Sequence, residues 1–326
     1  MPLPDPAGER RDPLVSVVIP AYNCEAYIRD AVDSVVSQTF TDYELIVVND
    51  ASTDGTPQIL RSYERSGRLR VVAHERNRGL SAARNSGIRA ARGKYVTFLD
   101  ADDAWRPEKL EYQMAILRER PDIMLLGNEE MTWIHGRKVT FPPLPERPQL
   151  RPVEWRQLLS GRCSLSPSNA IMRKECFEAV GGFDETLRSA EDRDQWLRIV
   201  RRFPAMVDPA AVVNAYRVHP SNMSANPTRM RDNMKAVLRK AFNDVPCPWP
   251  VRARAYAHCY LDVAINCYEC RKRLLGLDQI LKSLLVWPFP LGGEAKRPPL
   301  IRLVWAAKIA LGRSAFERVW MRGRSA

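Results

Sequence analysis

Apolar runs and helical patterns alternate through the first hundred residues of the chain. Four short segments are almost continuously hydrophobic, as strands covered on both faces of a sheet are: residues 14–19, 43–48, 69–73 and 95–99. The segments between them, residues 26–38, 56–66 and 80–91, repeat apolar residues at helical spacing. This βαβαβαβ order predicts an α/β fold with a doubly wound, mostly parallel sheet whose loops gather at one edge.

The fourth apolar run ends in an acidic segment, Asp100-Ala101-Asp102-Asp103. Crowded carboxylates repel one another unless a cation lies among them, and oxygen ligands on a short loop suit Mg²⁺ or Mn²⁺, which also bind phosphates. We interpret the segment as a site for a divalent metal and a diphosphate. The alternative is an acidic turn that caps a helix starting near Pro107.

Polar loops follow the other apolar runs, and together with later segments they form an ordered set of motifs. VSVVIPAYN, ELIVVNDASTDGT, NRGLSAARNSGIRAARGKYVTFLDADD, SAEDRDQWLRI and YRVHPSNMS resemble the successive signatures of family 2 glycosyltransferases with the A-type nucleotide-sugar fold. The resemblance runs from Val15 to Ser224, about two thirds of the chain. It implies a Rossmann-like nucleotide-sugar domain that transfers a sugar, with inversion, from a nucleotide diphosphate donor to an acceptor hydroxyl.

The resemblance assigns residues to the donor site. Pro20 and Tyr22 lie where the first strand ends, and the Tyr22 ring either stacks on the base or anchors the loop. Asp50 matches the position that contacts uracil in similar enzymes, although Asn49 replaces the first of two acids common there; the alternative for Asp50 is to cap the next turn. Arg84 lies in a stretch that the family places near the donor, where a guanidinium would pair with a diphosphate, unless it belongs to a solvated helix face.

Metal ligands are expected on two of these motifs. Asp102 is the expected direct ligand and Asp100 the ribose-side contact, because alternate positions of an extended segment point the same way. Asp103 either supports the site from behind or caps the following helix. His219 matches a family segment that lies over the diphosphate and can complete the metal shell, although an isolated histidine is more often structural. The expected cofactor is Mn²⁺ or Mg²⁺.

The general base should come from Glu191-Asp192, which precedes the amphipathic run Gln195 to Val200. The pair is expected at a helix start, where amide dipoles stabilise negative charge. In similar enzymes the aspartate takes the acceptor proton, which assigns that role to Asp192 and an orienting role to Glu191. By local sequence alone, a helix cap with a first-turn acid is the alternative.

The segment between the metal motif and the base should choose the acceptor. Residues 131–134 and 138–141 suggest a hairpin around residues 135–137, followed by a proline-rich stretch. Trp133 and Trp155 either stack on sugar rings or pack in the fold. The expected partners are a nucleotide-sugar donor and a saccharide or lipid-linked acceptor.

Charge separates the last hundred residues from the rest. Residues 1–226 carry 31 Lys+Arg and 31 Asp+Glu, whereas residues 227–326 carry 19 and 7, which accounts for the whole net charge of +12. We therefore expect a loose leader over residues 1–12, a catalytic domain over 13–226 with a nucleotide-binding half (13–105) and an acceptor half (106–226), and a basic helical C-terminal region over 227–326. The basic amphipathic stretch 300–311 suits an anionic membrane surface, or else packs on the catalytic domain.

The cysteine content favours a cytosolic protein, and the family resemblance together with the basic C-terminal region suggests a role at the inner face of the cytoplasmic membrane, in bacterial surface polysaccharide or glycolipid synthesis. The number of cysteines, seven, is odd, and their spacing does not provide the two cysteine pairs of a zinc site. Such cysteines are typical of reduced thiols. A sugar-nucleotide nucleotidyltransferase would usually carry a Gly-rich phosphate loop after the first strand. A nucleic-acid-binding protein would explain the pI near 9.6, but the acidic motifs repel phosphate backbones, so we expect no nucleic-acid partner.

Overall fold

The computed structural model describes residues 11–134, 138–159, 165–219, 222–223, 226–289, 291 and 301–311. The chain divides into two compact units. The first comprises Met1–Trp155 and Ser164–His219, and the second comprises Arg156–Cys163 and Pro220–Ala326. Nearly all of the expected leader lies outside the described residues.

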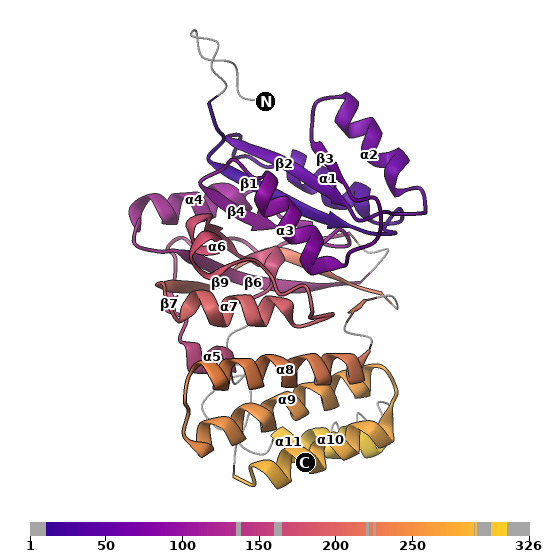
Figure 1. Cartoon of the computed structure of the whole chain (residues 1–326), viewed down its shortest axis with the longest axis vertical. Coiled ribbons are helices and arrows are strands. Elements are labelled where there is room, and N and C mark those ends of the chain that lie inside the picture. The colour runs from indigo at the N-terminus through magenta and orange to yellow at the C-terminus, as the bar shows by residue number, and fades with distance from the viewer. Residues whose placement is uncertain are drawn as a thin grey trace. The chain divides into compact units, whose positions relative to one another are not determined.

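Within the described residues, the first unit is built on a nine-stranded sheet (Figure 1). Its strands are β1 (Val15–Ala21), β2 (Tyr43–Asn49), β3 (Arg70–Ala73), β4 (Tyr95–Phe98), β5 (Ala104–Trp105), β6 (Leu125–Ile134), β7 (Arg151–Pro152), β8 (Ile171–Arg173) and β9 (Ala205–Val218). Their spatial order is β3-β2-β1-β4-β8-β6-β9-β5, with β7 beside β9. The first four strands are parallel, which confirms the predicted doubly wound layout. Beyond β4 the sheet is mixed, because β8 runs antiparallel to both β4 and β6.

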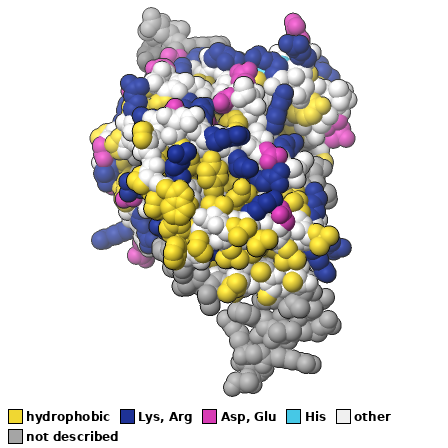
Figure 2. All heavy atoms as spheres, turned by 60° about the horizontal axis from the view of Figure 1, so that its bottom comes forward, with side chains coloured by type: hydrophobic (Ala, Val, Ile, Leu, Met, Phe, Trp, Pro, Cys, Tyr) yellow, Lys and Arg dark blue, Asp and Glu magenta, His cyan; other side chains and the backbone are white. Residues whose placement is uncertain are grey.

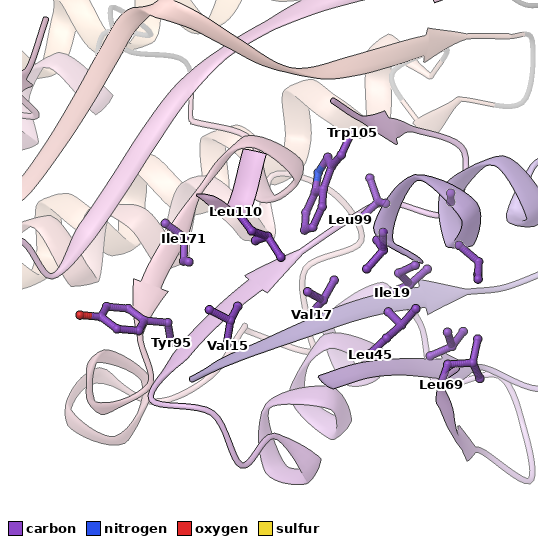
Figure 3. Close-up of a cluster of buried hydrophobic side chains, with 14 of the residues drawn as sticks. Val15, Val17, Ile19, Leu45, Leu69, Tyr95, Leu99, Trp105, Leu110 and Ile171 are labelled. Atoms are coloured by element: carbon purple, nitrogen blue, oxygen red, sulfur yellow. The ribbon is translucent and has the colours of Figure 1, made fainter. Parts of the chain in front are cut away.

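Helices connect these strands. They are α1 (Ile28–Val36), α2 (Thr56–Arg65), α3 (Leu80–Ala90), α4 (Lys109–Glu119), α5 (Trp155–Leu159), α6 (Glu175–Val180) and α7 (Glu191–Val200), with a 3₁₀ turn at Pro167–Asn169. Alternate residues of β1, namely Val15, Val17 and Ile19, join one buried cluster with apolar residues of α1, α2 and α4 (Figure 3). Every residue of β1 is buried, as expected for a strand covered on both faces.

The opposite face of β1 is covered by α3, which approaches it closely. A Cβ added at Gly87 would lie 2.2 Å from Cγ1 of Val18. Only glycine therefore permits this helix to lie so near the strand. The close packing fixes the position of the whole helix, including Arg84 one turn before.

The part of the first unit after β5 differs from the prediction in one respect. Residues 131–134 form the end of β6, but residues 138–141 form no strand, and residues 135–137 lie outside the described residues. The expected hairpin was wrong, because residues 131–134 pair in parallel with residues 215–218 of β9 instead of with residues 138–141. The long return strand β9 occupies the edge that a hairpin partner would need.

The second unit is helical. Its helices are α8 (Pro227–Asp244), α9 (Trp249–Glu269), α10 (Arg273–Val286) and α11 (Ile301–Leu311). The apolar side of α11 packs into the core of this unit: Ile309 is fully buried, and Trp305 lies against Tyr268 of α9 at 5.5 Å between ring centroids. For α11 the structure thus shows packing on α9 and α10 of its own unit, whereas the alternatives expected from the sequence were a membrane surface or the catalytic domain. None of the described helices combines the length and the apolar character needed to cross a bilayer.

Candidate functional site

The ends of parallel strands bring the predicted motifs to one edge of the sheet. Ala21 of β1 is in register with Asn49 of β2, and Val18 with Phe98 of β4. The first two loops are also tied together, because the Asn23 amide donates to Ser52 Oγ at 3.1 Å and the Thr53 amide donates to Asn23 Oδ1 at 2.8 Å. The donor-side motifs therefore adjoin one another, as sheet topology requires.

The acidic segment separates into two kinds of carboxylate. The side chains of Asp100 and Asp102 are 31% and 27% exposed, whereas Asp103 is buried. Asp103 accepts hydrogen bonds from the Arg217 amide at 3.0 Å and from Asn214 Nδ2 at 3.2 Å. Burial, with the charges of Asp102 and Asp100, raises its pKa well above the ordinary value. Asp103 thus ties the loop to β9 and does not cap α4, while Asp100 and Asp102 remain partly exposed.

Asp102 and His219 come together from segments 117 residues apart. Oδ2 of Asp102 lies 2.9 Å from Nε2 of His219, and the imidazole stacks on Tyr27 with ring centroids 4.6 Å apart. Burial, and then the neighbouring charge of Asp100, raises the pKa of the Asp102 carboxyl, while His219 opposes this shift. The two predicted metal ligands are adjacent, which the sequence distance between them did not guarantee.

The Asp102–His219 pair fits a divalent cation. A carboxylate oxygen suits Mg²⁺ or Mn²⁺, and an imidazole nitrogen is a common ligand of transition metals; these two atoms lie 2.9 Å apart. No group of three His, Cys, Asp or Glu side chains suited to a metal occurs in the part of the chain that the structure describes. Mg²⁺ is usually bound by one or two carboxylates together with waters and substrate phosphates, and Asp102 can supply one such carboxylate.

Arg84 joins the acidic segment to the predicted base. Its guanidinium is buried and donates to Asp100 Oδ1 at 2.6 Å and to Glu191 Oε1 at 2.5 Å. Burial alone would lower the pKa of Arg84, but Asp100 and Glu191 outweigh it and raise the pKa above the ordinary value. Arg84 is therefore not part of a solvated helix face. It positions two carboxylates, and its predicted contact with the diphosphate remains a prediction.

Glu191 and Asp192 form the first turn of α7, as predicted. The preceding residue, Ala190, has a φ of 58°, so the chain turns sharply into the helix. Glu191 is buried, whereas Asp192 is partly exposed and accepts a hydrogen bond from the Arg193 amide at 2.7 Å. Burial raises the pKa of both carboxyls, in Glu191 against Arg84 and in Asp192 against Arg193 and Arg84. A carboxylate with a raised pKa is a better proton acceptor.

Asp50 is buried in a hydrogen-bonded loop. Its oxygens accept from the amides of Arg78 and Gly79, both at 2.8 Å, and lie 2.6 Å from His74 Nδ1. Gly79 has a φ of 91°, a backbone conformation that favours glycine. Asp50 therefore holds the loop after β3. The alternative role expected for it, capping the turn that follows it, is not what these contacts show. The uracil contact expected from the resemblance stays a prediction.

The two residues at the end of β1 are placed differently from each other. Pro20 is buried within the strand, and Tyr22 follows it with half of its surface exposed. An exposed ring at a strand end can stack on a base, whereas a loop anchor would be more deeply buried. The position of Tyr22 is thus compatible with the stacking interpretation.

A second layer of residues, which no sequence motif indicated, lies beside the acidic segment. Glu130 of β6 accepts from Ser166 Oγ at 2.7 Å and from Asn214 Nδ2 at 3.4 Å, and burial raises its pKa. Arg217 donates to the Asp102 carbonyl at 2.7 Å and lies 3.5 Å from the centroid of the Trp133 ring. Trp133 therefore packs on a guanidinium. The sequence did hold one signal for Arg217: alternation along an extended strand places residues 217 and 219 on the same face.

Trp155, the other predicted stacking residue, begins α5 and is partly buried. No contact in the first unit distinguishes a sugar-binding role from packing at this position. Its role therefore stays a prediction.

Comparison with known sequences agrees with the motifs. The family model described as Glycosyl transferase family 2 matches residues 16–181. The uncharacterized glycosyltransferase EpsJ of Bacillus subtilis is 32% identical over 275 residues, which cover 80% of this chain and 76% of that protein. The putative teichuronic acid biosynthesis glycosyltransferase TuaG of the same bacterium is 49% identical over 109 residues, but the match covers 33% of this chain and only 43% of TuaG.

Solved structures share the fold. The mannosyltransferase PcManGT from Pyrobaculum calidifontis, in complex with GDP-Man and Mn²⁺, has a TM-score of 0.60 at 22% identity, over 98% of this chain and 85% of that one. Residues 1–349 of TarS from S. aureus, in complex with UDP-GlcNAc, have a TM-score of 0.56 at 20% identity, over 92% of each chain. At these identities the likeness shows the architecture, which is the one that the motifs predicted.

Proposed function

The chain is a glycosyltransferase of family 2, and from that premise we propose that it transfers a sugar from a nucleotide-diphosphate donor to an acceptor hydroxyl, with inversion at the anomeric carbon. The observation that carries this proposal is the convergence of distant motifs on one acidic segment. Asp102 meets His219, and Asp100 is linked through Arg84 to Glu191. A metal and diphosphate site beside a general base is the arrangement that such a transfer needs.

Asp192 is the proposed general base. In the transfer, the acceptor oxygen forms a bond to the anomeric carbon while the bond from that carbon to the diphosphate breaks, and the hydroxyl proton passes to Asp192. The raised pKa of this carboxyl supports the role, and its partial exposure gives an acceptor access to it. Glu191, held by Arg84, keeps the start of α7 in place.

Asp102 and His219 are the proposed holders of Mn²⁺ or Mg²⁺. When bound, the cation would neutralise charge on the departing diphosphate. Within the protein, the backbone of Asp102 is fixed by Arg217, whose Nε donates to the Asp102 carbonyl. Asp100 stands beside the cation site as the proposed ribose-side contact. Such a preset carboxylate requires little rearrangement when donor and metal bind.

The proposed donor is a UDP-sugar, bound by Pro20, Tyr22 and Asp50. Asp50 supports a uridine base only through the family motif, because its oxygens already hold the loop after β3. TarS has been captured with UDP-GlcNAc and PcManGT with GDP-Man, so the fold itself accommodates either base. For the acceptor we propose a saccharide or lipid-linked glycan in the synthesis of a bacterial surface polysaccharide, as the name of TuaG suggests.

Donor binding and turnover test the proposal together. We would measure binding of UDP-, GDP- and dTDP-sugars by calorimetry with and without Mn²⁺, and release of the nucleoside diphosphate from each. We expect one donor to bind in a metal-dependent way and to be turned over. Binding without metal at full affinity, or pyrophosphate release from a nucleoside triphosphate, would contradict the proposal.

One site variant and one matched control test the metal role of Asp102. Asp102→Ala should weaken both Mn²⁺ binding, followed by electron paramagnetic resonance, and donor binding. Asp122→Ala removes an exposed carboxylate beyond the end of α4 and should change neither. Equal Mn²⁺ affinity in these two variants would refute the assignment of Asp102.

A further inference from the structure

The second unit exposes large hydrophobic side chains on one of its helices. Among the described residues, six large hydrophobics of this unit are more than half exposed: Trp249, Leu274, Leu281, Leu285, Phe289 and Leu303. Soluble proteins expose single hydrophobic residues routinely, but a contiguous group of them usually marks an interaction site. Three of the six belong to α10, where they recur at positions i, i+7 and i+11, on one face of the helix.

Helix α10 carries apolar residues on its outer side as well as on its inner side, unlike an ordinary surface helix. The side packed against the rest of the unit includes Gly276, Gln279, Ile280 and Ser283, all buried. The opposite side presents Leu274, Leu281 and Leu285, which are 86%, 56% and 73% exposed. A helix whose outer side is also apolar is usually covered on that side by other apolar groups. The outward leucines are therefore hard to explain if water is their only neighbour.

Aromatic rings extend this surface beyond the end of α10. The ring of Trp287 lies 5.2 Å from that of Phe289 and 6.0 Å from that of Trp249, measured between centroids. Phe289 and Trp249 are 60% and 65% exposed. We call the three leucines of α10 with Trp249 and Phe289 the apolar face of α10. Figure 2 shows hydrophobic side chains gathered on the side of the molecule that it brings forward, with Lys and Arg around them.

The charge near this face is positive. Arg271, Lys272 and Arg273 are exposed at the start of α10, and Arg252 is exposed on α9. The described residues from 227 onward carry 13 Lys+Arg and 5 Asp+Glu. Apolar and aromatic side chains bordered by cations are the combination that binds the interface of an anionic membrane.

We propose that the apolar face of α10 lies in the interfacial region of an anionic phospholipid bilayer. With 14 residues, α10 is about 21 Å long, shorter than the bilayer's hydrocarbon core of about 30 Å, so it would lie along the surface. Trp249 and Phe289 would enter at headgroup depth, where amphipathic rings prefer to lie. A second copy of the chain is a poorer occupant, because a two-fold interface would bring like cations together. This proposal does not depend on the glycosyl-transfer chemistry.

Vesicle co-sedimentation of the full chain tests the proposal. We expect binding to vesicles of phosphatidylcholine with phosphatidylglycerol, little binding to phosphatidylcholine alone, and weakening by salt. Lys272→Glu with Arg273→Glu should weaken binding more than tenfold, since each cation near an anionic surface contributes about fivefold. Arg61→Glu with Arg65→Glu makes the same charge change on exposed positions of α2 and should have a much smaller effect.

Substitution of the leucines tests the apolar contribution separately. Leu281→Asp with Leu285→Asp should reduce binding at least about tenfold, whereas Leu281→Phe with Leu285→Phe should retain it. Both positions are exposed, so circular dichroism and donor binding should be unchanged in both pairs. Wild-type protein that ignores anionic vesicles, or an Asp pair that binds like wild type, would overturn the proposal. A dimer that dissociates in the Asp pair, without vesicle binding by the wild type, would assign the face to a second copy instead.

Discussion

Arg84 carries a buried positive charge whose removal should unbalance the candidate site. Arg84→Met keeps most of the side-chain volume but leaves the buried Glu191 carboxylate without its cation. The Glu191 side chain is 6% exposed, and loss of one partner of a buried pair costs about 3–5 kcal/mol. The Asp100 contact adds little, because that carboxylate is 31% exposed and water can replace part of the interaction. We therefore expect a loss in the free energy of unfolding near the lower end of that range.

Urea unfolding measures this loss, and pH dependence identifies its cause. Arg84 lowers the pKa of Glu191, which burial has raised, so its removal raises that pKa further. A folded-state pKa above the unfolded value means that the folded protein binds the extra proton, so the variant's stability should rise as pH falls through the folded pKa. The free energy of unfolding that Arg84→Met loses relative to wild type should then be smaller in mild acid than above neutral pH.

A double-mutant cycle gives the decisive comparison. Arg84→Met combined with Glu191→Gln should recover about 1.5–3 kcal/mol, because the uncompensated charge is gone. Arg89→Met, an exposed arginine of the same helix, should cost only about 0.5 kcal/mol. A loss below about 1 kcal/mol for Arg84→Met, or no recovery in the double variant, would refute the reasoning.

Three further predictions follow from packing, burial and metal binding. Gly87→Ala should cost about 1–3 kcal/mol in urea unfolding, because its Cβ would meet Val18 at 2.2 Å, and Val18→Ala should reduce that cost. Lys109 is fully buried, which lowers its pKa well below the ordinary value. The unfolded chain therefore binds the extra proton, and the free energy of unfolding of the wild type should rise with pH toward the unfolded pKa of about 10.4. Lys109→Met should lack this gain. Mn²⁺ should raise the melting temperature less as pH falls through the raised pKa of Asp102, because protons compete for that ligand; an unchanged increase would contradict the assignment.

The parallel half of the fold was predictable because its signal is local. The strands and helices up to Phe98 begin and end within about two residues of the predicted ranges, since each one carries its own apolar period. The family resemblance was likewise readable from the motifs and is confirmed by the matching family model. The predicted hairpin failed because β6 pairs with β9, some eighty residues later in the chain, and no local pattern encodes that pairing.

The sequence indicated candidate site residues but not the contacts between them. The sequence indicated Asp102, His219 and Glu191, yet nothing in it indicated that Arg84 bridges Asp100 to Glu191. Glu130 was missed because an isolated acid in a strand has no distinctive spacing; only the fold places it beside Ser166. Such contacts depend on crossovers between distant segments, which residue patterns do not specify.

The most direct test of the central claim compares donor binding with transfer in Asp192→Asn. With a donor identified, we would measure its dissociation constant by calorimetry and the initial rate of nucleoside diphosphate release in the presence of acceptor. The account predicts unchanged donor affinity and a rate lower by about 10²–10⁴-fold, because general-base catalysis typically contributes that much. Transfer at the wild-type rate by this variant would contradict the assignment of Asp192 as the base.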